Sequence, residues 1–158
     1  MAFLAGRYTA TYNSLACGQT ADGWRPSHQF FKRLITGDAW AQAPQDAVYQ
    51  GAEFLIGGRL IEYDAAAVAS AMWPYNATKW TMGVVGRTDV GSSLVKSLVL
   101  TAVAGTPAAS TPATLTIPRA ILQEGFPVEL LFAPDLREVP LRFRAYPDSS
   151  TGVFATET

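Results

Sequence analysis

The chain has 158 residues, a length that fits one domain, residues 1–158, able to bury a core of its own. Only 16% of the residues are charged while 49% are hydrophobic, and this shortage of charge indicates that other subunits cover part of the surface. Twelve Lys and Arg against thirteen Asp and Glu leave a net charge of -1, which argues against a tight electrostatic grip on nucleic acid.

The N-terminal part of the chain predicts strands and a turn. Residues 7–17 are rich in Tyr, Thr and Ala and predict either a strand or an extended arm, with a possible N-terminal arm over residues 1–17. Turn chemistry follows at Asp22-Gly23 in "GQTADGW". The stretch "HQFFKRLI" then predicts a strand whose alternate residues face opposite sides, Phe30, Lys32 and Leu34 on one and Phe31, Arg33 and Ile35 on the other.

A polar loop containing Gly and Pro, residues 36–46, leads into the next strand region. The loop is long for a connection within a compact domain, so we expect it to have a function. The region after it, "AVYQGAEFLIGGRLIEY", predicts one or two strands interrupted by Gly51, Gly57 and Gly58. A bulge or a close backbone approach is the usual reason for glycine inside a strand.

One short helix is predicted directly after this region, over about residues 64–73. Asp64 is a good N-cap, and Pro74 ends the helix because it disfavours helical geometry at the residue before it. A helix of this length is stable only when it is packed, and its alanines allow it to lie close to a sheet. The residues expected to pack or fix it are Asp64, Val68, Met72 and Trp73.

The rest of the chain predicts further short strands. "KWTMGVVGR" and "LVKSLVLTAV" come first, followed by a loop of small residues, Pro and Ser/Thr over residues 104–114. "LTIPRAIL" and "FPVELLFA" follow, and "VPLRFRAY" alternates cleanly, with Leu141, Phe143 and Ala145 inward and Arg142 and Arg144 outward. "GVFATET" predicts the last strand. Short strands with turns between them and one short helix favour a mainly β fold, an antiparallel sandwich or barrel.

No group of residues points to catalysis. His28 is the only histidine and Cys17 the only cysteine, so the chain has no partnered metal ligands and no internal disulfide. There is no nucleophile-elbow motif, and the glycines at 83, 86 and 91 lack phosphate-loop spacing. We therefore expect no catalytic, cofactor-binding or metal site, and a protein that is not an enzyme.

A mixed-charge stretch lies near the C-terminal end. Arg137, Arg142 and Arg144 stand there among Asp135, Glu138 and Asp148. Two interpretations stay open, a solvated strand face and a contact between subunits.

The start of the chain has no basic region followed by a long apolar stretch, and no apolar run long enough to span a membrane occurs. We expect a soluble protein without a membrane partner, made and kept inside the cell until assembly.

Four stretches together carry a resemblance to a known family. "GQTADG" looks like an early Gly-x-Thr turn, and "DAWAQAPQDAVYQG" is similar to a Pro-x-Asp segment that leads into a strand. "LIEYDAAAVASAMW" resembles a strand-to-helix junction, and "VPLRFRAYPDSSTGVFATET" resembles a closing pair of strands around a Pro-Asp turn. In this order they resemble the tail tube proteins of long-tailed bacteriophages, over nearly the whole chain.

The resemblance implies a β-sandwich or half-barrel flanked by one short helix, with copies closing into a hexameric ring and rings stacking into a hollow tube. The protein would then be located in the virion tail and assembled in the host cytoplasm. DNA would pass without specific binding, and a tape-measure protein, a sheath and terminator proteins would be possible partners. The loops 36–46 and 104–114 would reach the next ring, and the candidate contact residues between subunits are Gly37, Asp38, Trp40, Pro44, Asp46, Arg137, Arg142 and Arg144.

Other functions stay open. A tail-terminator, baseplate or head-completion ring protein would share the composition and the fold. A small-ligand-binding β-barrel would use aromatic side chains to line a pocket, and the candidates are Trp40, Trp73, Trp80, Phe30 and Phe31.

Overall fold

Strands make up nearly all the regular structure that can be described. The computed structural model describes residues 7–37, 43–63, 66–67, 71, 94–104, 114–125 and 138–158. These residues contain seven strands: β1 (Tyr8–Tyr12), β2 (Leu15–Thr36), β3 (Pro44–Tyr63), β4 (Lys96–Ala102), β5 (Thr114–Leu122), β6 (Val139–Ala145) and β7 (Thr156–Glu157). The prediction of a mainly β protein is confirmed.

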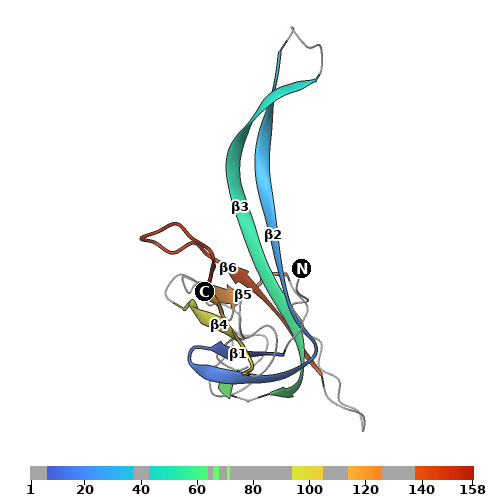
Figure 1. The fold of residues 1–158 in the computed structure, drawn as a ribbon, viewed down its shortest axis with the longest axis vertical. Coiled ribbons are helices and arrows are strands. Elements are labelled where there is room, and N and C mark those ends of the chain that lie inside the picture. Colours follow the sequence, from blue (N-terminus) through green and yellow to red (C-terminus); the bar gives the residue numbers. More distant parts are fainter. Residues whose placement is uncertain are drawn as a thin grey trace, which may run out of the picture.

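Six of the strands close into an antiparallel barrel (Figure 1). Their order around the barrel is β4-β1-β2-β3-β6-β5, and β5 pairs back to β4. The short β7 pairs with β5 at Leu115 and Thr116, beyond the part of β5 that β6 occupies. The described strands therefore form a closed barrel, one of the two folds that the strand pattern favoured, and not the sandwich or half-barrel that the family resemblance implied. Closure leaves the paired segments without free edges.

The core fills the inside of this barrel. Tyr12 stacks on Phe143 with 5.1 Å between ring centroids, and the tyrosine hydroxyl donates a hydrogen bond to the Ala120 carbonyl oxygen at 3.1 Å. Burial raises the pKa of Tyr12 far above its ordinary value. The other large, fully buried side chains are Ile56, Leu60, Leu98, Ile117, Val139, Leu141 and Cys17. Leu141, Phe143 and Ala145 point inward as the alternation in β6 predicted.

Residues 7–17 contain the strand β1 and the beginning of β2. β1 and β2 form a hairpin whose two turn residues, Asn13 and Ser14, have φ values of 53° and 63°. Positive φ at both central residues is the geometry of the tight turns that suit twisted antiparallel strands. Of the two interpretations, strand and extended arm, the structure shows the strand.

The sequence predicted a turn at Asp22-Gly23, but the structure has a bulge within β2 at this position. β2 runs on from Leu15 to Thr36, and its residues 21–23 form extra length between the pairs Thr20–Leu60 and Trp24–Gly58. Gly23 adopts φ +84°, and its N–H donates to the Thr20 hydroxyl oxygen at 3.2 Å. The glycine supplies the conformation that a bulge needs, and the strand continues beyond it.

Two of the strand glycines in β3 have the structural reasons that were expected. Gly51 has φ +141° and lies where the β2–β3 register shifts. At Gly58 an added Cβ would lie 2.9 Å from Cε3 of the Trp24 ring, so the indole requires a residue without a side chain there. A Cβ added at Gly57 would make only ordinary van der Waals contacts, the nearest with the Leu141 carbonyl oxygen at 3.4 Å.

The described helical residues agree with part of the predicted helix. Ala66, Ala67 and Ala71 are helical, and Ala67 and Ala71 are buried, Ala71 within the barrel core. The predicted packing residues Asp64, Val68, Met72 and Trp73 lie outside the described residues. No helix in the described ranges has the length and apolar character needed to cross a membrane.

Candidate functional site: the β2–β3 arm

Beyond the barrel, β2 and β3 continue together as a long two-stranded arm (Figure 1). We use the name arm for residues 29–37 and 43–53. β1 pairs with β2 only at residues 15–18, and β6 pairs with β3 only at residues 54–60. In the described pairings, both outer edges of the arm therefore carry backbone N–H and C=O groups without a partner strand, and such edges invite pairing with another chain.

One face of the arm carries an aromatic and aliphatic strip. Phe30 and Leu34 are each 58% exposed, and Tyr49 is 59% exposed. The Phe30 ring lies 5.1 Å from the His28 ring and 6.5 Å from the Tyr49 ring, centroid to centroid. These rings contact one another on the surface, and they leave most of their apolar area in water.

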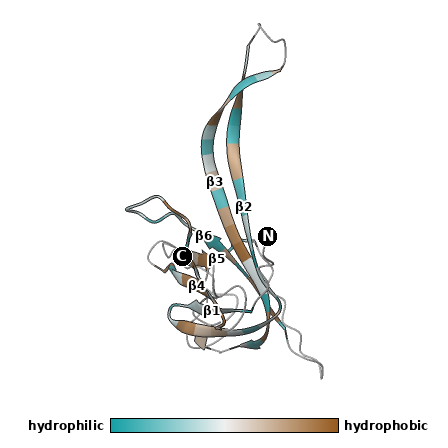
Figure 2. Cartoon of the chain, in the orientation of Figure 1, coloured by the Kyte–Doolittle hydropathy of each residue, from teal (hydrophilic) through white to brown (hydrophobic). Residues whose placement is uncertain are grey.

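The opposite face is apolar as well. Phe31, Ile35 and Val48 are 42%, 43% and 51% exposed. Cross-strand partners share a face, and the Arg33–Val48 pair places Val48 on the side of Phe31 and Ile35. Figure 2 shows hydrophobic and hydrophilic segments alternating along both strands of the arm. An antiparallel ribbon in water normally has a polar outer face, so exposed apolar residues on both faces distinguish the arm from an ordinary surface hairpin.

An ion-pair cluster fixes the base of the arm to the barrel. Arg144 on β6 places its Nη1 2.7 Å from Glu53 of the arm and its Nη2 2.6 Å from Glu124 after β5. Its Nε also donates to Glu124 at 2.9 Å, which makes that contact bidentate. Burial opposes the charge on Glu124, but the hydrogen bonds and charge of Arg144 outweigh it and lower the pKa of the carboxyl. Burial likewise opposes the charge on Arg144, and its carboxylate partners raise its pKa.

A groove with arginines around it lies on the outside of the barrel at the same end of the arm. Gly57 is paired with Arg25 on one side and Arg142 on the other, so all three lie in one row on one face. Arg59 also lines the groove, whose volume is about 460 Å³. We call this feature the arginine groove, defined by Arg25, Gly57, Arg59 and Arg142.

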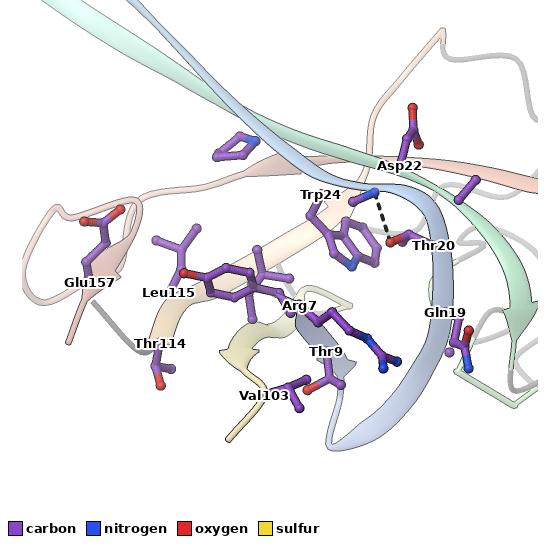
Figure 3. A pocket seen from close by; sticks show the side chains of 16 residues that line it. Arg7, Thr9, Gln19, Thr20, Asp22, Trp24, Val103, Thr114, Leu115 and Glu157 are labelled. Atoms are coloured by element: carbon purple, nitrogen blue, oxygen red, sulfur yellow. Dashed lines mark hydrogen bonds between the residues drawn. The ribbon is translucent and has the colours of Figure 1, made fainter. Parts of the chain in front are cut away.

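A second hollow, of about 540 Å³, lies at one mouth of the barrel (Figure 3). Trp24 and Leu115 supply apolar surface to it, and Arg7, Asp22 and Glu157 are among its charged lining residues. Phe30 and Phe31 lie on opposite faces of the arm and not in this hollow. The other aromatic residues proposed for a ligand pocket, Trp40, Trp73 and Trp80, lie outside the described residues.

The predicted contact residues of the 36–46 loop belong to the far end of the arm where they are described. Pro44 is the first residue of β3 and pairs with Thr36, and Gly37 directly follows β2. An added Cβ at Gly37 would lie 2.9 Å from the Gln45 side chain. Asp46 is exposed and accepts a hydrogen bond from the Ala47 N–H at 2.7 Å. Asp38 and Trp40 lie outside the described residues, as do residues 105–113 of the second predicted loop.

The three predicted arginines have different surroundings. Arg142 lines the arginine groove, and Arg144 is held in the ion-pair cluster within one chain. Arg137 lies outside the described residues. The sequence placed Arg142 and Arg144 together as outward residues of one strand, but it gave no sign of the partners of Arg144, which are 91 and 20 positions away.

Sequence reasoning missed the arm as a unit. The signal was present in "HQFFKRLI", where the neighbouring pairs Phe30-Phe31 and Leu34-Ile35 put apolar residues on both sides of a strand. A strand with one face on the core alternates apolar and polar residues, whereas apolar residues on both sides are typical of a strand that is covered on both faces. The pattern did not reveal that only the neighbouring strand β3 would pair with it.

Within the described ranges, no three His, Cys, Asp or Glu residues lie close enough together to hold a metal ion. His28, at the base of the arm, contacts the Phe30 ring edge-to-face. No protein-family model matches the chain, and comparison with curated proteins finds no match.

Proposed function

We propose that the protein is the structural subunit of a bacteriophage tail tube, in which hexameric rings stack into a hollow conduit for DNA. The observation that carries the proposal is the arm, a two-stranded ribbon that exposes apolar side chains on both faces and has unpaired edges. A two-stranded hairpin alone is at best marginally stable in water. Association with other copies supplies both the missing strands and the missing apolar cover.

In such an assembly, the arms and barrels of neighbouring copies pair edge to edge and close a ring. Backbone hydrogen bonds along the arm edges provide the affinity, and the side chains on its two faces provide the fit. A closed ring of paired strands has no free edge left, which prevents uncontrolled aggregation. The exposed end of the arm, with Pro44 and Asp46, then extends toward the next ring.

A conduit must let DNA slide, and the charges outside the barrel suit that role. Arg25 pairs with Asp22 at 2.8 Å, Arg59 pairs with Glu138 at 3.2 Å, and Arg144 pairs with two glutamates. Strong DNA binding depends on many arginines and lysines that neutralise phosphates. Here Arg25, Arg59 and Arg144 already have carboxylate partners, and the net charge of the chain is -1, so passage without capture is the expected behaviour.

Negative-stain electron microscopy of the purified protein at high concentration tests the proposal. Hollow rods or stacked rings are the expected result. Single rings that never stack would favour a tail-terminator, baseplate or head-completion protein of the same fold. Monodisperse particles without rings under all conditions would overturn the assembly function.

A paired substitution ties the result to the arm. Phe30→Ser combined with Phe31→Ser removes one apolar side chain from each face and should abolish rods while the barrel stays folded. Val153→Ser is the matched control, since Val153 is also an exposed apolar residue, 43% exposed, but lies outside the arm. If the control disrupts rods as strongly as the arm variant does, the arm does not carry the assembly.

The hollow at the barrel mouth supports a second candidate, a small-ligand-binding protein. Its volume of about 540 Å³ falls within the usual range for ligand sites, and Trp24 gives it an aromatic surface. Native mass spectrometry of the purified protein tests this function. A bound small molecule that is lost in Trp24→Ala would support it, and a ligand-free mass would count against it.

A further inference from the structure

The arm has two parts that differ in exposure. On β3, Gly51, Ala52 and Glu53 are partly buried, whereas every residue from 43 to 50 is exposed. We call residues 29–31 and 51–53 the arm base, and residues 32–37 and 43–50 the distal arm. Figure 1 shows the far end of β2 and β3 standing clear of the barrel. The cover that the barrel gives to β3 therefore ends at the arm base.

The contacts between arm and barrel end at the same place. β6 pairs with β3 only as far as Phe54, which lies opposite Ala145. The ion pair of Arg144 with Glu53, 2.7 Å long, is one residue further out. No hydrogen bond, ion pair or ring contact joins the described residues of the distal arm to the barrel. The distal arm is thus held in place only through the arm base.

The β2–β3 ladder is interrupted where the arm base meets the distal arm. Phe31 pairs with Gly51 and Lys32 pairs with Tyr49, so Gln50 is an extra residue without a partner. Gly51 has φ +141°, and a Cβ added to it would have no heavy atom within 4 Å. A bulge breaks the ladder locally and bends the strand. Here the space around the bulge is open, so no packing at Gly51 fixes the bend.

One ring contact spans the bulge. Phe30 of the arm base and Tyr49 of the distal arm lie 6.5 Å apart, centroid to centroid, with their planes tilted by 58°. Both rings are more than half exposed. Segments with few buried apolar contacts and solvent-exposed backbone hydrogen bonds are the parts of a fold that move most easily. The contact therefore favours one direction of the distal arm without fixing it.

We propose that the bulge at Gln50-Gly51 is a joint, at which the distal arm pivots on a base that Arg144 clamps to the barrel. Hinges of this kind consist of a few residues that absorb the change in backbone angles. The barrel and the arm base keep one geometry, while the distal arm takes several directions and can adapt to a partner. The inference goes beyond the proposed function and does not depend on it, because the pivot is a property of a single chain.

Pulsed EPR distances between nitroxide labels on dilute, disassembled protein test the joint. A label at Thr101→Cys on β4 is combined with one at Gln29→Cys in the arm base or at Ala47→Cys in the distal arm, and all three positions are exposed. The distance distribution to Ala47 should be at least about twofold wider than the distribution to Gln29. Equal widths would overturn the inference. The unmodified chain, whose Cys17 is buried, gives the labelling background.

Deletion of Gln50 tests whether the bulge is the joint. The deletion removes the extra residue but leaves the pairs Phe31–Gly51 and Lys32–Tyr49, so the register and the two faces of the arm stay as they are. The distribution to Ala47 should then narrow about twofold, to the width found at Gln29. An unchanged width would show that the motion does not come from the bulge, and the inference would be wrong.

Gly51→Ala provides a second variant that adds no clash. The alanine meets open space but is strained at φ +141°, so the backbone at the bulge must change. The mean distance to Ala47 should shift, while the mean distance to Gln29 stays the same. A variant with both means unchanged would count against a joint at this position.

Arg144→Gln tests the clamp. Loss of the contact with Glu53 should widen the distribution to Gln29 as well, because the arm base is then released from the barrel. Arg59→Gln is the matched control, since it removes the 3.2 Å ion pair with Glu138, which does not involve the arm. The control should leave both widths unchanged, and equal widening in the two variants would show that Arg144 is not the clamp.

Discussion

The barrel and the arm are built from the same two strands, β2 and β3, but they differ in where their apolar side chains lie. In the barrel, Ile56 and Leu60 of β3 are fully buried and face the core. In the arm, Val48 and Tyr49 are adjacent, point to opposite faces and are both more than half exposed. The barrel therefore buries its apolar side chains within one chain, whereas the arm leaves apolar side chains exposed on both faces.

The same change made in the two regions should give the largest contrast. Phe143→Ala removes a ring that is fully buried in the barrel and should lower the free energy of unfolding by about 3–5 kcal/mol. Phe30→Ala removes a ring that is 58% exposed and should change it by less than about 0.5 kcal/mol. Urea unfolding of dilute, disassembled protein measures both.

Assembly should respond to the Phe30→Ala change, which leaves monomer stability almost unaltered. Rod formation by Phe30→Ala should need a higher protein concentration than the unmodified chain does, as measured by pelleting. If Phe30→Ala destabilised the monomer as much as Phe143→Ala, the arm would be part of the folded core and the contrast between the regions would fail.

A second contrast lies between neighbouring glycines of β3. Gly58→Ala forces a methyl group against the Trp24 ring and should cost about 1–3 kcal/mol of stability, since the packed indole must move. Gly57→Ala meets ordinary contacts and should change stability by less than about 0.5 kcal/mol. Thermal unfolding of the two variants checks this, and equal losses would show that the Trp24 contact does not constrain the strand.

The ion pairs at the arm base should contribute less than the core and more than exposed pairs. Arg144→Gln should cost about 1 kcal/mol because Arg144 and Glu53 are each only 23% exposed. Arg25→Gln, which removes a pair with 75% and 41% exposed side chains, should cost less than about 0.5 kcal/mol. Chemical denaturation at neutral pH measures both, and a larger loss in Arg25→Gln would contradict the ranking.

The pH dependence of the same cluster follows from Glu124. Arg144 lowers the pKa of this carboxyl below its ordinary value of 4.5, so the folded state holds the proton less tightly than the unfolded state does. The stabilising contribution is present above pH 4.5 and is lost as the pH falls through the lowered folded value. In Arg144→Gln this part of the pH dependence should disappear from the unfolding curves.

The smallest expected effect belongs to the loop after β6. Asp148 accepts hydrogen bonds from the Ser150 N–H at 2.9 Å and the Thr151 N–H at 3.0 Å, and also from both hydroxyls. These hydrogen bonds lower the pKa of the Asp148 carboxyl from 3.8 to about 2, and the bond from the Ser150 hydroxyl has the largest effect. Its contribution is present above pH 3.8 and is lost as the pH falls through about 2.

Carboxyl NMR titration measures this pKa directly. Ser150→Ala removes the strongest donor and should move the Asp148 midpoint up toward 3.8 without a change in the barrel. An unshifted midpoint would show that the loop does not hold the carboxylate as described.

Several elements could be predicted from the sequence because their signal is local. Strict alternation identified Leu141, Phe143 and Ala145 as the inward side of β6. The pattern of "HQFFKRLI" gave the two faces of β2 correctly, residue by residue. A bulge or a close approach was expected at Gly51, Gly57 and Gly58. The structure has a register shift at Gly51 and a close approach at Gly58, but only ordinary contacts at Gly57. The prediction of a turn at Asp22-Gly23 was wrong. The same backbone conformations occur in a turn and in a bulge, and only the pairing with β3 distinguishes the two.

The sequence by itself determined the strand character of this protein, its shortage of charge and which residues alternate on the two sides of β2 and β6. Only the tertiary structure decided that β5 meets β4 and closes a barrel, that β2 and β3 leave that barrel together as an arm, and that Arg144 joins Glu53 to Glu124. The physical reason is the distance along the chain between the residues that determine each feature. Side-chain periodicity reports which face of a strand is apolar, whereas strand neighbours and ion-pair partners depend on contacts between residues far apart in the chain.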